Sequence, residues 1–192
     1  MNKGIIGGAS EPVVIYSVNG QALNYDDRSN SLVVSTLFDQ AVNEEKMWDA
    51  TYATPSTIAD NASLDMLIIV PANIKVDMVM SSTGGGDSEI FFYENAVVSN
   101  NGTPLPIVNL NRNSVGTPAL QLFITPTITN AGNQLSNFFV PGGTGPHSSG
   151  NIAAAGRKWI FKANTIYLLR TYNRAGAAKR MGCGANWTES QA

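Results

Sequence analysis

The chain has 192 residues, enough for one domain or for one domain with an arm. Only 14% of the residues are charged, and Asn, Gly and Pro are abundant, a composition that favours turns over helices. The single Cys excludes an intrachain disulfide and a multi-cysteine zinc site, and the single His excludes a two-histidine metal motif. No apolar stretch reaches the ~20 residues of a membrane span. We therefore expect a protein made inside a cell, with no membrane segment, no cofactor and no enzymatic activity.

Charge is distributed unevenly along the chain. Residues 1–94 hold thirteen acidic and four basic side chains, whereas residues 95–192 hold eight basic side chains and Glu189 as their one acid. Such an asymmetry fits contact with nucleic acid, self-complementary packing of copies, or mixing of the charges on one folded surface. The basic half has no Lys/Arg run longer than two and no nucleic-acid motif, so direct contact with nucleic acid is the least favoured of the three.

The first third of the chain differs from the rest in composition and in the pattern of its apolar residues. Val13–Tyr16 is a short β-prone run, and apolar residues from Leu37 to Trp48 recur at roughly helical spacing, which predicts a helix. Few large apolar residues occur here, so we predict an N-terminal arm or attachment segment over residues 1–58, followed by a β-sandwich domain over residues 59–192. Because the arm is too short to enclose a core, its apolar groups must be covered by a sister subunit, the β domain or a larger shell. The predicted interface residues are Val14, Phe38 and Trp48.

From Ser63 onward the pattern is that of β-strands. Leu64–Val70 is a nearly continuous apolar run ended by Pro71, and Ile74–Met80 alternates with a period of two. Asn101-Gly102 predicts a hairpin between residues 96–99 and 106–110. Turn signals about every ten residues predict an all-β protein, an antiparallel, jelly-roll-like β-sandwich with an N-terminal arm. The other expected strands are Glu89–Tyr93, Ala119–Thr125, Phe138–Val140, Lys158–Lys162, Thr165–Tyr172 and Ala185–Glu189.

The candidate catalytic residues lack partners. His147 lies in a Gly/Pro/Ser loop that cannot hold a base in a Ser-His-Asp arrangement, so it is interpreted as an exposed loop residue. Cys183 lies between two glycines, and no second Cys or His completes a mechanism, so a small buried filler is the better interpretation. The Gly-rich segments Gly84–Gly86 and Gly142–Gly145 lack the Lys of a phosphate-binding loop and are interpreted as hairpin turns.

The acidic pairs and the tryptophans also have plain structural interpretations. Asn24 and the pair Asp26-Asp27 offer oxygen ligands for calcium, but their spacing is not that of an EF-hand, and they are interpreted as solvated turn residues. Glu44-Glu45 are sequence neighbours, whereas glycosidase acids face one another across a cleft. A sugar-stacking platform is one use of the three tryptophans, but aromatic residues on strands are more often core or subunit interface. The three are Trp48, Trp159 and Trp187.

Several motifs of the second half, in this order, resemble those of a family of small virion proteins of tailed bacteriophages. The family combines an aromatic-acidic strand, an Asn-x-Asn-Arg-x-Ser segment and a late strand of the type Trp-Ile-Leu-Lys-x-Asn-Thr-x-Tyr-Leu-Leu. The resemblance covers about residues 63–190, and the first 60 residues depart from it. The matching segments are Ile90–Glu94, Asn101–Thr103, Val108–Ser114, Lys158–Arg170 and Asn186–Glu189.

The resemblance implies a structural virion protein that decorates and cements the capsid shell. Its expected partners are the major capsid protein and further copies of itself, most simply in a trimer, and its expected location is the outer surface of the capsid after synthesis in the host cytoplasm. Similar sequences are also assigned to tails and fibres. The alternative is therefore a tail or head-fibre component that recognises a glycan on the host surface.

Overall fold

The computed structural model describes residues 37–142 and 150–191, together with four short strands nearer the N-terminus; side chains are described for residues 38–142 and 157–191. The chain divides into two compact units, Met1–Gln40 and Ala41–Ala192. In the first unit, β1 (Lys3–Ile6) pairs antiparallel with β2 (Val13–Tyr16), and β3 (Tyr25–Asp26) pairs with β4 (Ser31–Leu32). The strand predicted at Val13–Tyr16 is confirmed. The described helix α1 (Leu37–Asn43) has seven residues, and no helix in the described part of the chain has the length and hydropathy needed to cross a membrane.

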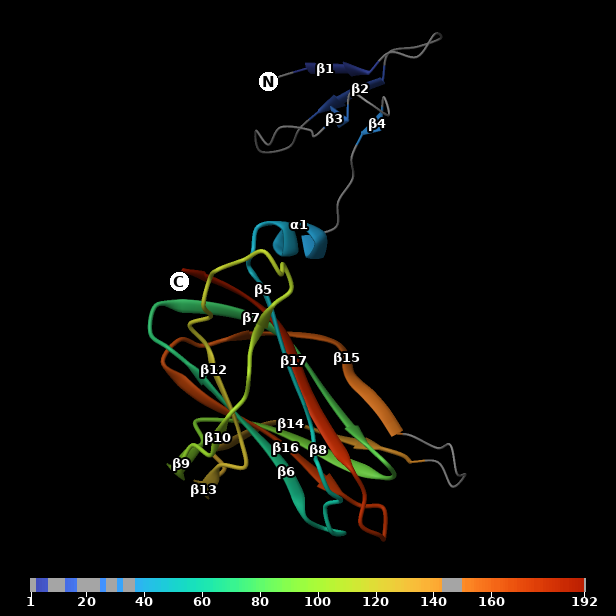
Figure 1. The fold of residues 1–192 in the computed structure, drawn as a ribbon, viewed down its shortest axis with the longest axis vertical. Coiled ribbons are helices and arrows are strands. Elements are labelled where there is room, and N and C mark those ends of the chain that lie inside the picture. The colour runs from blue at the N-terminus through green and yellow to red at the C-terminus, as the bar shows by residue number, and fades with distance from the viewer. Residues whose placement is uncertain are drawn as a thin grey trace. The chain divides into compact units, whose positions relative to one another are not determined.

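Two antiparallel sheets form the second unit and pack face to face (Figure 1). The five-stranded sheet has the order β11-β5-β17-β7-β15, and the six-stranded sheet has the order β10-β12-β6-β16-β8-β14. Eight strands make up the framework: β5 (Met47–Ala53), β6 (Ser63–Val70), β7 (Ile74–Gly84), β8 (Ser88–Glu94), β14 (Asn133–Val140), β15 (Gly150–Phe161), β16 (Thr165–Asn173) and β17 (Met181–Gln191).

The pairing of these eight strands is that of a jelly roll. The first strand pairs with the last, β5 with β17, and the second with the seventh, β6 with β16. The third pairs with the sixth, β7 with β15, and the fourth with the fifth, β8 with β14. One long antiparallel hairpin is thus rolled so that its paired strands alternate between the two sheets. The predicted all-β sandwich of jelly-roll type is confirmed.

The core lies between the sheets and follows from the alternation of side chains along each strand. In β8, Ile90 and Phe92 point inward and are buried, and in β17 Trp187 is fully buried. Phe161 and Tyr167 stack with 4.4 Å between their ring centroids, next to Phe92. Such a chain buries enough apolar surface to hold the sandwich without a disulfide.

A two-stranded ribbon inserted between β8 and β14 crosses the outer face of the six-stranded sheet. β9 (Val97–Asn100) pairs antiparallel with β13 (Thr127–Asn130), and the two lie together at one side of the sandwich in Figure 1. The insertion also adds β12 (Gln121–Ile124) and β10 (Thr103–Pro104) to one edge of the six-stranded sheet and β11 (Val108–Asn109) to one edge of the five-stranded sheet.

The two arms of the ribbon have the same local geometry. Each leaves the sheet through a residue of positive φ, Asn95 (63°) or Thr125 (56°), and each returns through an Asn-x-Gly turn. In these turns the N–H groups of Gly102 and Gly132 donate to the side-chain oxygens of the Asn two residues earlier, at 2.8 and 2.9 Å. A Cβ on Gly102 would lie 2.2 Å from the Ile124 carbonyl oxygen, and one on Gly132 would lie 2.2 Å from that of Glu94. At both turns only glycine fits, because the φ angle is positive and there is no room for a Cβ.

The arm expected over residues 1–58 differs from what the structure shows. The helix ends at Asn43 rather than continuing to Trp48, and Trp48 lies in β5, the strand that pairs with β17. Trp48 is 6% exposed and packs in the core with Ala50, so it is not available as a contact to another subunit. Residues 47–53 belong to the sandwich because their alternate side chains fill its core.

The hairpin predicted around Asn101-Gly102 is wrong, although the turn itself exists. The strands on its two sides pair elsewhere, β9 with β13 and β10 with β12. The turn at Gly84–Gly86 likewise joins strands of different sheets, β7 and β8, instead of closing a hairpin. Local turn chemistry fixes where the chain bends, whereas the partner of a strand depends on contacts distant in sequence.

Candidate binding surfaces

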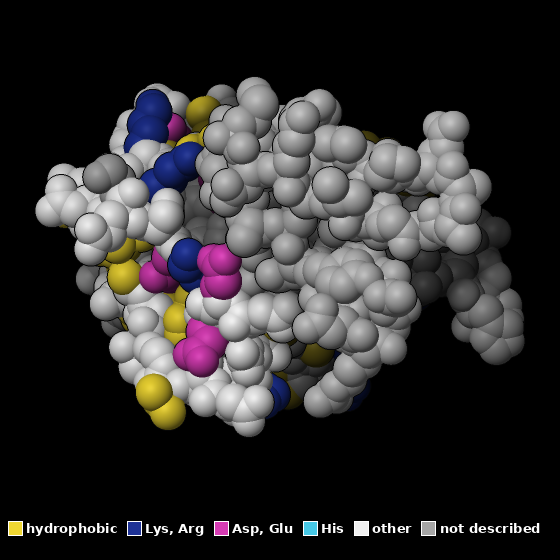
Figure 2. Space-filling view, turned by 90° about the horizontal axis from the view of Figure 1, so that it is seen from above, with side chains coloured by type: hydrophobic (Ala, Val, Ile, Leu, Met, Phe, Trp, Pro, Cys, Tyr) yellow, Lys and Arg dark blue, Asp and Glu magenta, His cyan; other side chains and the backbone are white. Residues whose placement is uncertain are grey.

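Charges of the two halves of the chain meet on the folded surface. Each of four ion pairs joins an acid from residues 1–94 to a base from residues 95–192, so the described part of the chain mixes its charges within one molecule. Figure 2 shows acidic and basic side chains next to one another in the view from above. The uneven distribution in sequence is therefore no argument for nucleic acid or for packing of copies. The four pairs are Asp65–Arg170 (2.7 Å), Asp77–Lys158 (2.9 Å), Glu89–Arg174 (2.9 Å) and Glu94–Lys162 (2.7 Å).

The outer face of the six-stranded sheet is divided into two halves of different character. Under the ribbon, Leu67 and Leu168 are fully buried and form a second small core with Ala96. Beyond the ribbon, β6, β16 and the neighbouring β8 carry charged and aromatic side chains of intermediate exposure, of which Tyr93 also packs against the small core. We call this second region the open half-face; it comprises Asp65, Glu89, Phe91, Tyr93, Arg170, Tyr172 and Arg174.

Strand register brings the members of the open half-face together. Arg170 in β16 stands opposite Asp65 in β6 and opposite Phe91 in β8. Tyr172, two residues further along β16, stands opposite Glu89. Since residues i and i+2 of a strand share a face, the side chains form adjacent rows across three neighbouring strands.

The three aromatic rings of the open half-face contact one another. Phe91 stacks on Tyr93 with 6.0 Å between the ring centroids and meets Tyr172 edge-on at 5.7 Å. The Arg174 guanidinium lies 4.7 Å from the centre of the Tyr172 ring, a cation–π distance. Burial raises the pKa of Tyr93, and the neighbouring Tyr172 adds to this, so the Tyr93 hydroxyl stays neutral at physiological pH.

Both arginines of the open half-face are fixed by carboxylates. Arg170 donates from Nε and Nη2 to the two carboxylate oxygens of Asp65, at 2.8 and 2.7 Å. These bonds raise the pKa of Arg170, so the guanidinium remains charged. Arg174 donates to Glu89 at 3.0 Å and to the side-chain oxygen of Asn61 at 2.6 Å. The charges of the two arginines and the two carboxylates cancel, so these pairs leave the surface without net charge.

A second surface lies at β14 and β15, which are edge strands of the two sheets and lie next to each other. Within the described residues neither strand has a partner on its outer edge. Large apolar side chains are exposed on the outward sides of these two strands: Phe139 (59% exposed) and Leu135 (40%) in β14, and Ile160 (62%) in β15. Phe139 stands opposite Glu89 on the outer face of the six-stranded sheet, and Ile160 stands opposite Asp77 on the outer face of the five-stranded sheet. Phe138 points inward and is covered by the Arg157 guanidinium, 4.8 Å from its ring centre. We call Leu135, Phe139 and Ile160, with the backbone edges that carry them, the edge surface.

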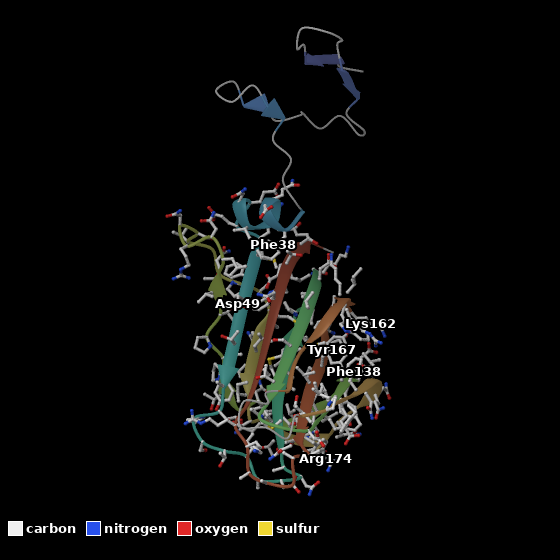
Figure 3. The ribbon with its side chains drawn as sticks, turned by 90° about the vertical axis from the view of Figure 1, so that its right-hand side faces the viewer. Phe38, Asp49, Phe138, Lys162, Tyr167 and Arg174 are labelled. Atoms are coloured by element: carbon white, nitrogen blue, oxygen red, sulfur yellow. The ribbon has the colours of Figure 1, made fainter. Side chains whose placement is uncertain are left out.

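Hydrogen bonds among Lys162, Tyr167 and Glu94 join the ends of three strands at one end of the sandwich. Lys162, Tyr167 and Phe138 lie on the same side of the sandwich in Figure 3. The Tyr167 hydroxyl accepts a bond from the Lys162 N–H at 2.9 Å and donates to Glu94 at 3.3 Å. Burial raises the pKa of Tyr167, which keeps that hydroxyl a donor. The cluster holds the ends of β8, β15 and β16 together.

The outer face of the five-stranded sheet carries a shallow hollow of about 220 Å³. Its lining residues are Thr51, Tyr52, Ala53, Ser81, Thr83, Gly182 and Cys183. Burial raises the pKa of Cys183 to about 12, so the thiol is neutral and is a poor nucleophile. Among the described residues, no group of three His, Cys, Asp or Glu side chains is arranged to hold a metal ion.

The structure places the residues singled out in the sequence in separate regions. Cys183 is a buried filler, as predicted. Trp187 lies in the core, one of the two positions expected for a strand tryptophan, and Trp159 packs against the same core. Phe38, in α1, is 52% exposed. Val14 lies in β2, with its side chain outside the described residues, as are His147, Asn24 and Asp27. Asp26 ends β3, and Glu44, at the turn after α1, pairs with Lys46 at 2.8 Å.

The open half-face was not predicted from the sequence, although the alternation of residues along β8 and β16 carries a signal for it. Glu89, Phe91 and Tyr93 alternate with the buried residues of β8, and Arg170, Tyr172 and Arg174 follow the same spacing from β16 onward. Alternating charged and aromatic residues opposite an apolar face indicate the outward side of a half-buried strand. Which strands bring these two runs together is decided by the sheet order alone.

Strand order and pairing define the class of this protein: it is a jelly-roll β-sandwich, an architecture found in viral capsid, lectin and cupin domains. No protein-family model matches the chain, and no curated protein matches it in sequence.

Proposed function

We propose that this protein is a structural component of a tailed-bacteriophage virion, which decorates the capsid and stabilises it by binding between subunits of the major capsid protein. The observation that carries the proposal is the edge surface. Two adjacent edge strands with unpaired backbone and three exposed apolar side chains are an aggregation hazard on a free monomer. Such a surface fits a subunit that works in an assembled state.

Two further observations support this function. The ordered motifs of residues 63–190 resemble small virion proteins, and the jelly roll is a common capsid architecture. Decoration needs no bond to be made or broken. Each copy that bridges shell subunits adds contact free energy that must be lost before the shell opens, and several copies in a closed ring act together.

The test is binding to shells that lack this protein. Purified chain is mixed with expanded capsids, the bound copies are counted by sedimentation, and their position is found by electron cryo-microscopy. Phe139→Lys and Ile160→Lys place a charge in the edge surface and should each weaken binding at least about tenfold, as loss of an apolar anchor does. Val115→Lys is the matched control, because Val115 is 97% exposed and lies outside the edge surface.

Three results would count against decoration: no binding of the unaltered chain to shells, edge variants that bind as well as it does, or density for the protein at the tail of the intact virion. The last of these would favour the alternative, a tail or head-fibre component that recognises a host surface. The open half-face is the one observation that favours this alternative.

A further inference from the structure

The turn that follows β9 contains a dipeptide with a spontaneous chemistry of its own. Asn-Gly occurs at residues 19–20 and 101–102, and only the second pair lies in the described part of the chain. In such a dipeptide the glycine nitrogen can attack the side-chain carbonyl carbon of the asparagine, because glycine has no side chain to obstruct the approach. Asn101 is exposed, so water reaches the products of that attack.

The reaction is deamidation, and water is its only co-reactant. The Gly102 nitrogen forms a bond to Cγ of Asn101, and its proton leaves with the side-chain nitrogen as ammonia, which gives a cyclic succinimide. Water then opens the ring at one of its two carbonyl groups. One product is aspartate, and the other is isoaspartate, in which the main chain runs through the former side chain. Either product carries a negative charge at neutral pH that asparagine lacks.

The fold holds the attacking nitrogen away from this reaction. The Gly102 N–H donates to the side-chain oxygen of Asn100 at 2.8 Å, and this bond retains the proton that the nitrogen must lose. The main chain at Gly102 also has no room to turn. A Cβ at Gly102 would lie 2.2 Å from the carbonyl oxygen of Ile124 and 2.8 Å from the carbonyl carbon of Thr125.

Both neighbours of the Asn-Gly pair are held by strands. Asn100 stands opposite Thr127 of β13, and Thr103 stands opposite Ile124 of β12. Figure 1 shows β9, β10 and β13 together at one side of the sandwich. The nitrogen therefore becomes free to rotate only when the ribbon opens locally at this turn.

We propose that Asn101 is a deamidation site, which reacts only through local opening of the β9 turn and is protected in the closed turn by the Asn100 hydrogen bond. The rate in the native protein is then the rate in the open chain multiplied by the fraction of molecules that are open. Isoaspartate adds a main-chain carbon beside Gly102, where the structure has no space, so that product opposes reclosure of the turn. This inference goes beyond the decoration of a capsid and does not depend on it.

The first experiment compares folded and denatured protein. The full-length chain is incubated at mildly alkaline pH with and without denaturant, and peptide mass spectrometry follows the conversion of Asn101. Deamidation should be at least about tenfold slower in the folded protein. Equal rates in the two states, or no conversion of Asn101 in the denatured chain, would overturn the proposal.

Variants then test the role of the hydrogen bond. Asn100→Ala removes the acceptor and should raise the rate at Asn101 about three- to tenfold in the folded protein, with little change in denaturant. Asn100→Asp keeps an acceptor oxygen and should stay protected, which also covers the case in which Asn100→Ala fails to fold. Asn130→Ala is the matched control, because it removes the equivalent bond to Gly132 at the other end of the ribbon. Equal acceleration by Asn100→Ala and Asn130→Ala would overturn the assignment of the protection to Asn100.

The last measurement concerns the two products. Chains that carry isoaspartate at position 101 are separated by ion exchange and unfolded in denaturant. They should unfold at a lower denaturant concentration than the unaltered chain, whereas Asn101→Asp, which keeps the normal main chain, should unfold nearly as the unaltered chain does. Equal midpoints for the isoaspartate form and the unaltered chain would contradict the close packing at Gly102 on which the proposal rests.

Discussion

Asparagine side chains shape many of the turns in this protein. Four asparagines adopt positive φ angles between 53° and 63°, a conformation that Asn tolerates better than other residues with a Cβ: Asn61, Asn73, Asn95 and Asn164. Five others accept a hydrogen bond from the backbone N–H two residues later: Asn100, Asn109, Asn111, Asn130 and Asn173. The abundance of Asn thus has a direct structural cause, because local Asx turns replace hydrogen bonds that regular structure would otherwise supply.

Cys183 provides a residue-level test of the core. Because burial raises its pKa to about 12, its thiol should not react with a thiol reagent at pH 8 in the native protein and should react at once in denaturant. The unfolded thiol titrates near 9, so between pH 9 and 12 the unfolded chain binds fewer protons than the folded one. Stability should therefore fall as the pH rises through this window.

Denaturant titrations at pH 8 and pH 10.5 measure this fall, and Cys183→Ala should reduce it. Tyr93 and Tyr167, whose pKa values are also raised, contribute to the same alkaline loss in both proteins. Rapid labelling of Cys183 in the native state would contradict the packing described for β17.

Asp65 provides a second test, in the open half-face. Asp65→Asn leaves the guanidinium of Arg170, 18% exposed, without its charged partner. Removing one member of so enclosed a pair should lower the free energy of unfolding by about 2–4 kcal/mol. Chemical denaturation measures the loss, and Lys46→Gln, which breaks the exposed Lys46–Glu44 pair, should change stability by at most about 0.5 kcal/mol. Equal effects of the two substitutions would show that the Asp65 pair is no more enclosed than a surface pair.

At the scale of elements, the ribbon of β9 and β13 determines which part of the outer sheet face stays open. It covers Leu67 and Leu168 and stops short of Phe91. The Asn-x-Gly turn at each end of the ribbon requires glycine for two reasons. The φ angles of Gly102 and Gly132 are positive, and an added Cβ would meet a carbonyl oxygen.

Gly102→Ala and Gly132→Ala should each destabilise the protein by about 2–4 kcal/mol, since backbone must move to admit the methyl group. The control is Gly176→Ala, which has a positive φ of 68° but no heavy atom within 4 Å of the added Cβ, and which should cost about 1–2 kcal/mol. Thermal denaturation of the three variants gives the comparison. If Gly102→Ala lowered the free energy of unfolding no more than Gly176→Ala does, the close approach to the Ile124 carbonyl oxygen would not contribute to the loss of stability.

At the scale of the whole molecule, the edge surface and the low charge content lead us to expect a closed homo-oligomer, most simply a trimer. Light scattering should give about three times the chain mass of 20.4 kDa. Phe139→Lys should shift the mass toward that of one chain, whereas Val115→Lys should not. A mass of one chain for the unaltered protein at working concentration would remove the expectation.

The two compact units make a second prediction at this scale. Because β5 begins at Met47 and the second unit at Ala41, a chain that lacks residues 1–36 should keep the sandwich, with an unchanged β-type circular dichroism spectrum and cooperative unfolding. If the first unit supplies contacts to a shell or a sister subunit, the shortened chain should bind shells more weakly. Cutting after residue 50 instead removes half of β5 and should prevent folding, because β5 pairs with the last strand of the jelly roll.

The sequence by itself determined the class of this protein, its strands and its turns. Alternation in Ile74–Met80, the apolar run Leu64–Val70 and the spaced turn residues all have local causes, namely side-chain period and backbone preference. The same local signals placed Cys183 in the core correctly and left Trp187 between core and subunit interface, of which the core is what the structure shows. They also placed Trp48 in a helix, because apolar spacing over a dozen residues cannot separate a short helix that leads into a strand from one longer helix.

Only the tertiary structure decided which strands pair and which side chains meet. β5 finds its partner β17 more than a hundred residues later, and the Asp65–Arg170 bond spans a similar distance in sequence. Hydrogen bonding along a strand edge is nearly independent of sequence, so register and partner are selected by burial across the whole sandwich. For this reason the open half-face and the edge surface exist only in the folded sandwich.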